Sequence, residues 1–268
     1  MYFGLSEEQQ FFQESIDKFL EDTVTIDALK SYRTGEDDNL IDDVFNGLNE
    51  LGLSGLIIPE EYGGLGLDSL FAISVSESLG KGVAPYPFIG SFLIAPFLIN
   101  KLGSESQKQK YLPSIANGEY RFAVALTEMT GRRIKKGIQS SKQKLSGQSL
   151  FVMDDIHSTH YLILDSDGAL HIVEAEESGL EKVELKTVDI TSFVSELKLD
   201  QVKTEDLGNG PGNIDAIKQA INLGRVAIAS ETLGASQCML NRSVDYAKER
   251  KQFGRPIGSF QAVKHMCA

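Results

Sequence analysis

Basic side chains at two places in the sequence have the chemistry to bind phosphate groups. One cluster comprises Arg132, Arg133, Lys135 and Lys136. The other begins at Arg250, which is followed by Phe253 and Gln261. An arginine guanidinium is a planar fork that binds phosphate through two parallel hydrogen bonds. The alternatives are a solvated charged loop for the first cluster and a helix-terminal arginine beside a core phenylalanine for the second.

The histidines, glycines and cysteines do not indicate a metal site, a dinucleotide-binding loop or a disulfide framework. His157 and His160 are three residues apart, but no third ligand lies nearby, so surface histidines are a better interpretation than a metal site. The glycine-rich segment 208–212 lacks the spacing and the preceding strand of a dinucleotide-binding loop, and it is interpreted as a turn. Cys238 and Cys267 are expected to be reduced core residues, because two cysteines make a disulfide framework improbable.

Composition narrows the class of protein. The chain has 268 residues, of which 41% are hydrophobic, enough for a sizeable core in two domains or in one domain and part of another. Its net charge of −12 argues against nucleic acid or an anionic membrane as a partner. No signal peptide is recognisable, and reduced cysteines fit a cytoplasmic location. The longest apolar-rich stretch, residues 88–98, is too short and too broken to span a membrane.

Helical patterns dominate the first part of the chain. Residues 6–9 have the capping-box sequence that satisfies two free N–H groups at a helix start. Apolar residues then recur at helical spacing, namely Leu5, Phe12, Ile16 and Phe19. Residues 59–66 form a loop punctuated by proline and glycines. Further helical stretches are predicted at about 37–51, 69–79, 91–102 and 104–115.

The pattern changes to short strands near Glu119. Residues 122–127, 148–152 and 160–165 are rich in β-forming residues, and Ser166-Asp167-Gly168 predicts a hairpin that joins the last of these to residues 168–173. From residue 213 to about 251 the pattern is helical again. So long a helix is expected to pack against other long helices. Phe253 to Pro256 break it, and a new helix is predicted near Ser259.

Four blocks of sequence, in order, resemble the acyl-CoA dehydrogenase family. They are the loop at 59–66, the strand at 124–128 whose end holds a flavin ring in that family, a second flavin-facing strand at 151–155, and the most specific match, YAKERKQFGRPIGSFQ at 246–261. The resemblance covers essentially the whole chain. It implies an α+β fold with an N-terminal all-α domain at 1–118, a central β-barrel-like domain at 119–209 and the start of a C-terminal four-helix domain at 210–268.

The activity implied by the resemblance is FAD-dependent α,β-desaturation of an acyl-CoA thioester. A carboxylate removes the α-proton while the β-hydrogen leaves as hydride to the flavin. Because a thioester α-proton is only weakly acidic, such a site must hydrogen-bond the carbonyl oxygen, where enolate charge develops. Electrons then pass to an electron-transfer flavoprotein or a similar acceptor.

The resemblance also implies roles for particular residues, inside these blocks and between them. The resemblance places Leu126, Thr127, Phe151 and Met153 against the flavin ring. It places Arg250, Phe253 and Gln261 on the pyrophosphate and adenine of FAD across a subunit interface, which implies a homo- or hetero-oligomer. Arg133 and Arg225 fall near the substrate.

The sequence departs from the family at several of these positions. Phe151 stands where many members have a tryptophan, Arg133 where they have a serine, and Met153 where many have a hydroxyl that reaches the flavin, which a thioether cannot replace as a donor. Gly224 occupies a position where some members carry a glutamate base, and the more usual base position is expected beyond Ala268. Glu231, on the same helix, is interpreted as structural.

Three hypotheses therefore remain open. The first is an acyl-CoA dehydrogenase. The second is a non-catalytic partner subunit that completes the FAD site of a neighbouring chain. The third is an acyl-CoA oxidase, which differs only in oxygen access. A fatty acyl chain, a branched acyl chain and a steroid side chain are all compatible with the sequence.

Overall fold

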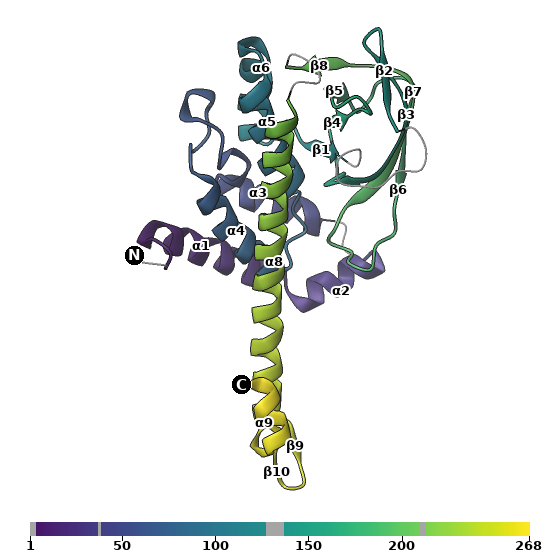
Figure 1. The fold of residues 1–268 in the computed structure, drawn as a ribbon. Helices are drawn as coiled ribbons and strands as arrows, with labels where there is room; N and C mark the ends of the chain where they lie inside the picture. The colour runs from purple at the N-terminus through teal and green to yellow at the C-terminus, as the bar shows by residue number, and fades with distance from the viewer. Residues whose placement is uncertain (1–3, 37–38, 127–136, 209–212) are drawn as a thin grey trace.

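The computed structural model of the chain describes residues 4–36, 39–126, 137–208 and 213–268. Most helices gather on one side, the strands lie on the other, and the long helix α8 runs between them (Figure 1). The helices are α1 (Glu7–Thr23), α2 (Ile26–Thr34), α3 (Leu40–Glu50), α4 (Ser69–Gly82), α5 (Ala95–Leu102), α6 (Glu105–Ala116), α8 (Ile214–Glu249) and α9 (Gln261–Cys267), with the 3₁₀ turns η1 (Leu53–Gly55), η2 (Glu60–Tyr62) and η4 (Ile257–Ser259) and the π-helical segment η3 (Phe88–Ile94).

Strands β1 to β8 lie in the sequence between the N-terminal helices and the long helix α8, as predicted, and the short strands β9 and β10 follow α8. The strands are β1 (Phe122–Ala125), β2 (Gln139–Ser141), β3 (Lys144–Met153), β4 (His160–Leu164), β5 (Leu170–Glu174), β6 (Leu180–Glu184), β7 (Val194–Lys203), β8 (Glu205–Leu207), β9 (Lys251–Gln252) and β10 (Arg255–Pro256). The α+β class is thereby confirmed.

Local sequence signals explain where several helices begin. The Ser6 hydroxyl accepts from the Gln9 backbone N–H at 3.1 Å, and the Gln9 side chain accepts from the Ser6 N–H at 2.9 Å, so the predicted capping box is confirmed. The predicted long helix is α8. Helix α2 was not anticipated. None of its residues is buried, so it carries no clear apolar stripe for the sequence to reveal.

The sheet is open rather than closed into a barrel. Its strands run in the order β6-β7-β3-β1-β4-β5-β8, with β2 paired to β3. All pairings are antiparallel except that of β1 with β4. Irregularities in the β3–β7 register let the sheet bend. Among the described strands, β6 and β8 nevertheless remain two separate edges, which corrects the expectation of a barrel-like domain.

The sheet has a core on each of its faces. Phe122 and Val124 of β1 belong to the large core formed with the helices, whereas Ala123 and Ala125 belong to a second core within the sheet. This division follows from the alternation of side chains along a strand. Strands β4 and β5 are buried in the same way, which explains their nearly continuous apolar sequences.

Helices α4 and α8 cross at two glycines. A Cβ added to Gly80 would lie 1.9 Å from the carbonyl oxygen of Glu231, and one added to Gly234 would lie 1.9 Å from the carbonyl oxygen of Glu77. Only hydrogen atoms fit between the two backbones at these points. Nearby, Ser230 Oγ donates to the Ile73 carbonyl at 2.9 Å. The crossing therefore fixes the position of α8 along the helical layer.

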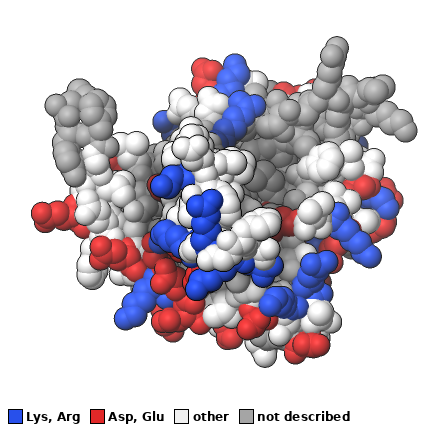
Figure 2. All heavy atoms as spheres, turned by 90° about the horizontal axis from the view of Figure 1, so that it is seen from below, with Lys and Arg blue, Asp and Glu red and all other residues white. Residues whose placement is uncertain are grey.

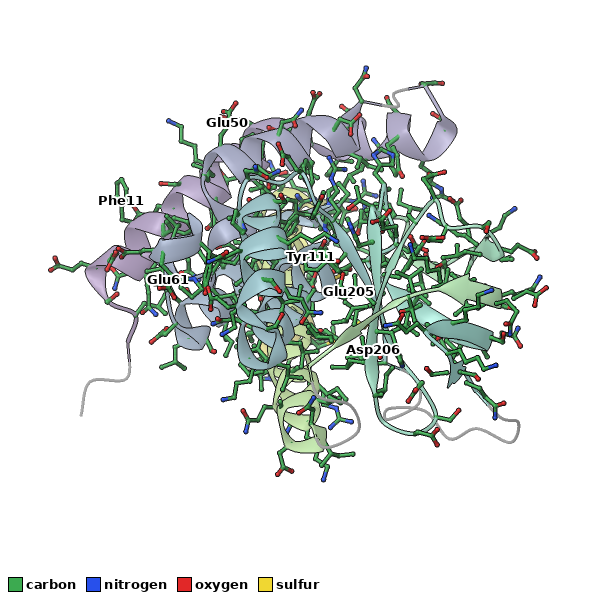
Figure 3. All side chains as sticks on the ribbon, turned by 90° about the horizontal axis from the view of Figure 1, so that it is seen from above. Phe11, Glu50, Glu61, Tyr111, Glu205 and Asp206 are labelled. Atoms are coloured by element: carbon green, nitrogen blue, oxygen red, sulfur yellow. The ribbon has the colours of Figure 1, made fainter. Side chains whose placement is uncertain are left out.

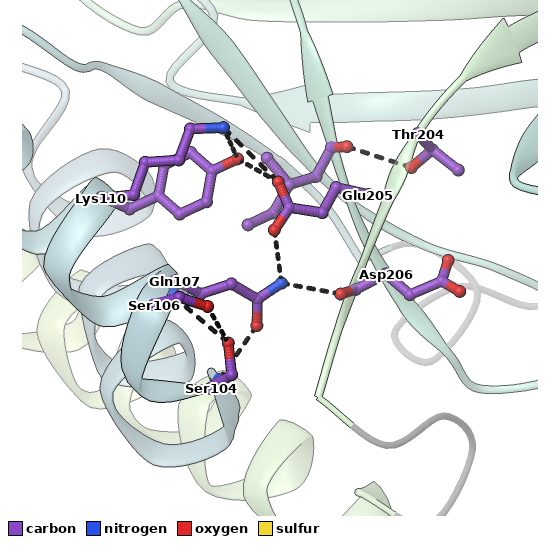
Figure 4. A network of polar contacts seen from close by, with 9 residues as sticks. Ser104, Ser106, Gln107, Lys110, Thr204, Glu205 and Asp206 are labelled. Carbon is purple, nitrogen blue, oxygen red and sulfur yellow. Dashed lines mark hydrogen bonds and ion pairs between the residues drawn. The ribbon is translucent and has the colours of Figure 1, made fainter.

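A polar network joins helix α6 to strand β8 (Figure 4). Tyr111 OH donates to Glu205 Oε2 at 2.7 Å, and Gln107 Nε2 donates both to Glu205 Oε1 at 2.7 Å and to the Asp206 carbonyl at 2.9 Å. Seen from above, Tyr111 of the helix lies next to Glu205 of the strand (Figure 3). Burial, and then the hydrogen bond to Glu205, raises the pKa of Tyr111 well above its usual value, which keeps the donor proton in place. The network holds the sheet edge against the helices.

A buried histidine lies at the centre of the sheet's other polar cluster. His171 of β5 places Nε2 2.9 Å from Asp165 Oδ2 and Nδ1 2.9 Å from Asp206 Oδ1. Only 2% of the His171 side chain and 3% of the Asp165 side chain are exposed. The other oxygen of Asp165 accepts the backbone N–H groups of Asp167 and Ala169, which shapes the predicted β4–β5 hairpin.

Within the described residues, none of the helices combines the length and the apolar character needed to cross a membrane.

We expect Gly234→Ala to lower the free energy of unfolding by about 2 kcal/mol, because the added methyl group must push apart two helix backbones. Gly224→Ala is the matched control on the same helix. Its added carbon would meet the end of the Ile94 side chain at 2.8 Å, and that end can rotate away. Urea denaturation compares the two. An equal loss of unfolding free energy in the two variants would contradict a close contact of the helix backbones at Gly234.

We expect His171→Ala to lower the free energy of unfolding by about 3 kcal/mol, because it leaves the Asp165 carboxylate buried without its partner. His157→Ala is the control, since that side chain is 59% exposed, and it should change stability by less than about 0.5 kcal/mol. Urea denaturation at neutral pH measures both. A mild effect at His171 would show that the cluster contributes little to stability.

Candidate functional site

The ends of two strands and one face of α8 enclose an apolar cavity of about 190 Å³. Val124 of β1 is paired with Met153 of β3, so the sheet brings both strand ends to the same place. Residues from η3 and α8 close the other sides. The apolar cavity is lined by Ile94, Val124, Leu126, Phe151, Met153, Ile221, Gly224, Arg225 and Ile228.

Four of the predicted site residues therefore meet at one cavity. They are Leu126, Phe151, Met153 and Arg225, which come from separate parts of the sequence. The Arg225 side chain donates to Asn222 Oδ1 at 3.2 Å, which leaves most of its donors available. Thr127 and Arg133 lie outside the described residues.

The β3 strand end has an unusual backbone at Phe151. This residue has a φ of 55°, in the left-handed region, and its side chain is 64% exposed. The register between β3 and β7 shifts between Ser149 and Val152, so Phe151 leaves the regular ladder at this point. A left-handed conformation costs a bulky residue about 1–2 kcal/mol. The irregular backbone places an exposed aromatic ring beside the apolar cavity.

Gly224 explains how closely α8 approaches η3. A Cβ at this position would lie 2.8 Å from Ile94 Cδ1 and 3.5 Å from Ile89 Cγ2. A larger side chain here would displace the Ile94 side chain and occupy part of the apolar cavity. The glycine thus leaves the cavity open at this wall.

A second cavity of about 220 Å³ adjoins the first, and Met153 and Ile228 line both. We call it the acidic cavity, because Asp154 and Glu231 line it. Its other lining residues are Ser76, Leu79, Ala84, Tyr86, Phe88, Ile89, Thr191, Ser192, Phe193 and Val194. The cavity lies between α4, the segment leading into η3, the end of β3 and α8.

Asp154 is held by the start of η3. Its Oδ2 accepts the Gly90 N–H at 2.5 Å. Burial raises the pKa of Asp154 to about 6, although hydrogen bonds from the Gly90 and Ser91 backbone work in the opposite direction. Backbone donors therefore orient the carboxyl group, and the residue as a whole is half-buried.

Glu231 belongs to the same cavity rather than to the helix scaffold alone. Burial, followed by the negative charges of Asp154 and Asp189, raises the pKa of Glu231 to about 7. Sequence reasoning interpreted Glu231 as structural, because no motif relates it to the other predicted site residues. Glu231 follows Ile228 by three residues, which is nearly one helical turn. It therefore lies on the same side of α8 as this residue of the apolar cavity.

The remaining predicted residues lie at the far end of α8. Arg250 follows the helix, Phe253 forms the β9–β10 turn, and Gln261 begins α9. At 1.5 Å per residue, Arg250 lies about 38 Å along the helix from Arg225. This end projects beyond the rest of the molecule (Figure 1), and a view from below shows Lys and Arg side chains gathered near its centre (Figure 2). The structure therefore separates the predicted cofactor residues into two sets within one chain.

Phe253 is presented to solvent in a strained conformation. It has a φ of 53°, and its side chain is 90% exposed. Phe260 approaches it at 6.2 Å between ring centroids, and the Arg255 guanidinium lies 4.1 Å above the Phe260 ring. An exposed aromatic ring beside arginines suits contact with a partner surface or a nucleotide.

Comparison with known proteins gives consistent matches. The sequence model for "Acyl-CoA dehydrogenase, N-terminal domain" matches residues 6–119, and that for "Acyl-CoA dehydrogenase, C-terminal domain" matches residues 213–268. An "Acyl-CoA dehydrogenase" of Bacillus subtilis (strain 168) is 32% identical over 246 residues, which cover 81% of this chain. The matched part spans 63% of that relative's length.

Two solved structures show the same fold. The glutaryl-coenzyme A dehydrogenase glutaryl-CoA complex superposes with a TM-score of 0.88 and 25% identity, covering 100% of this chain and 73% of that one. The ChsE4-ChsE5 complex from Mycobacterium tuberculosis gives a TM-score of 0.86 at 25% identity, covering 100% of this chain and 74% of that one.

We expect Glu231→Gln to stabilise the chain at high pH. The carboxyl group has a pKa of about 7 when folded and 4.5 when unfolded, so the folded state binds more protons between these values. Stability therefore falls as pH rises through this window. At pH 8 the glutamine variant should be more stable than wild type by about 2 kcal/mol, after allowance for partial exposure.

Urea denaturation at pH 8 and near pH 4.5 measures this effect, and the gain should shrink at the lower pH. Glu249→Gln, an exposed glutamate at the end of the same helix, is the control and should show no such change with pH. A gain at Glu231 that is equal at both pH values would argue against burial as its cause.

Proposed function

This chain belongs to the acyl-CoA dehydrogenase family, and from that premise we propose that it takes part in FAD-dependent α,β-desaturation of an acyl-CoA thioester. The observation that carries the proposal is the apolar cavity, where Leu126, Phe151, Met153 and Arg225 meet. A flavin ring and a thioester need an apolar site with a few polar groups that fix their orientation.

The residues of the apolar cavity fit a flavin ring. Phe151 offers an exposed aromatic face, and Met153 offers a polarizable side chain that packs well on a flat ring. The Met153 thioether cannot donate a hydrogen bond to the ring, so a donor at this position would have to be a backbone group. FAD, when bound, supplies the hydride acceptor for the reaction. The chain's part is to orient the ring and keep water from its face.

Arg225 is suited to act on the substrate. It is an exposed cation at the cavity wall with donors to spare, and a positive charge there favours an oxygen on which negative charge develops. Gly224 leaves room beside it for the acyl chain. The resemblance assigns the role of catalytic base to none of the acidic residues of this chain. An electron-transfer flavoprotein or a similar carrier would receive the electrons.

Arg250, Phe253 and Gln261 would serve the FAD of a second chain. They lie about 38 Å along α8 from Arg225, too far to contribute to the cavity of their own chain. An exposed arginine and an exposed phenylalanine match the pyrophosphate and the adenine of FAD in chemistry. The active assembly would therefore be an oligomer in which each chain completes its neighbour's site.

A second candidate function is that of a partner subunit that binds no flavin alone. Met153 lacks the hydroxyl that reaches the flavin in many members of the family, and Gly224 lacks a carboxylate. A complex of two different chains is among the similar structures. In that case Arg250 and Phe253 would complete the site of a different chain.

Mixing two defective variants tests the proposal. Arg250→Ala removes the phosphate contact and Phe151→Ala removes the ring contact, so each homogeneous protein should bind FAD at least about tenfold more weakly than wild type. A mixture should recover part of the lost binding, because it forms sites that combine an intact Arg250 with an intact Phe151. Absorbance in the flavin band and quenching of flavin fluorescence measure binding.

Arg242→Ala, an exposed arginine on the same helix, is the control and should bind FAD as wild type does. Failure of the mixture to recover binding would contradict a site shared between chains. A wild-type protein that turns yellow only after a second, different subunit is added would favour the partner function. Bleaching of the bound flavin by an acyl-CoA would support desaturation.

A further inference from the structure

We propose that Asp154 and Glu231 select acyl groups that carry a positively charged amine at their far end. This inference rests on the proposed function and deepens it, because it names a class of substrate for the same site. The acidic cavity would then be the distal part of the acyl pocket, and its two carboxylates would be specificity-determining residues.

The two cavities are neighbours that share part of their walls. Met153 and Ile228 line both of them. Gly224 and Ile228 face the apolar cavity, and Glu231 faces the acidic cavity. From Gly224 to Glu231 the helix rises about 10 Å, a distance that a medium-length acyl chain can reach.

In the described part of the chain, the acidic cavity presents two carboxyl groups as acceptors, while its side-chain hydroxyl groups are already engaged as donors. Each hydroxyl in its lining donates elsewhere. Ser76 Oγ donates to the Ala72 carbonyl, Tyr86 OH donates to Asn49 Oδ1, and Thr191 and Ser192 both donate to Asp189. A ligand that fills this space must bring its own donors if the carboxylates are to be satisfied.

The carboxylates also lack a counter-charge among the described residues. Asp154 accepts only backbone N–H groups. Neither Asp154 nor Glu231 forms an ion pair within the described part of the chain. Burial raises the pKa of both groups, and the negative charges of Asp154 and Asp189 raise the pKa of Glu231 further. A plain alkyl chain would bury the carboxylates further and make their ionisation still less favourable. An ammonium group would stabilise their negative charge.

The test compares three ligands of equal length with the FAD-loaded chain. They are octanoyl-CoA, ω-hydroxyoctanoyl-CoA and ω-aminooctanoyl-CoA, and isothermal titration calorimetry at pH 8 gives their dissociation constants. Wild type should bind the amine about tenfold more tightly than octanoyl-CoA, with the alcohol in between. Glu231→Gln and Asp154→Asn should each reduce this preference, and the double variant should bind octanoyl-CoA best.

Glu249→Gln is the matched control and should keep the wild-type preference. Glu231→Gln keeps the test decisive if Asp154→Asn disturbs the start of η3. Octanoyl-CoA binding as tight as that of the amine, tightest binding of the alcohol, or a preference that survives in both variants would overturn this inference alone. If none of the three ligands binds, the proposed function fails, and the inference fails with it.

Discussion

The close crossing of α4 and α8 is the constraint on which the rest of the molecule depends. Gly80 and Gly234 let the two backbones touch, and a methyl group at either position would separate them. Once α8 is held there, its residues face η3 and the strand ends in a fixed order. Gly224 and Arg225 then border the apolar cavity, and Glu231 borders the acidic one. The same crossing that packs the helices therefore sets which chemical groups line each part of the pocket.

The sheet contributes the opposite wall, and its burial on both faces makes that wall rigid. Strand β1 gives Phe122 and Val124 to the helical core and Ala123 and Ala125 to the sheet's own core. Neither face can shift without exposing apolar surface to water. The polar network from α6 to β8 anchors one edge of the sheet to the helices. The departure of Phe151 from regular strand geometry is tolerated because the surrounding strands are fixed in this way.

The length of α8 has a functional consequence as well as a structural one. Its N-terminal half is packed between the helices and the sheet, whereas Leu233, Met239, Leu240 and Tyr246 in the second half are exposed apolar residues. The expectation that the whole helix packs against long helices is thus met only for its first half within the described chain. A single rigid helix carries both a wall of the cavity and the exposed Arg250 and Phe253. The same helix thus links the cavity to the residues proposed to contact a second chain.

Much of the secondary structure could be predicted from the sequence, because the signals are local. The capping box at Ser6, the hairpin at Asp167 and the long apolar periodicity of α8 each depend on neighbouring residues. The resemblance to the family predicted Phe151 and Met153 near a flavin and Arg225 near a substrate, and all three line the apolar cavity. Helix α2 escaped prediction because none of its residues is fully buried. The barrel-like expectation was wrong because edge pairing depends on strands far apart in the sequence. The acidic cavity was decided by tertiary structure alone. No spacing relates Asp154 to Glu231, and burial by packed helices, rather than residue type, makes a common glutamate into a group with a pKa of about 7.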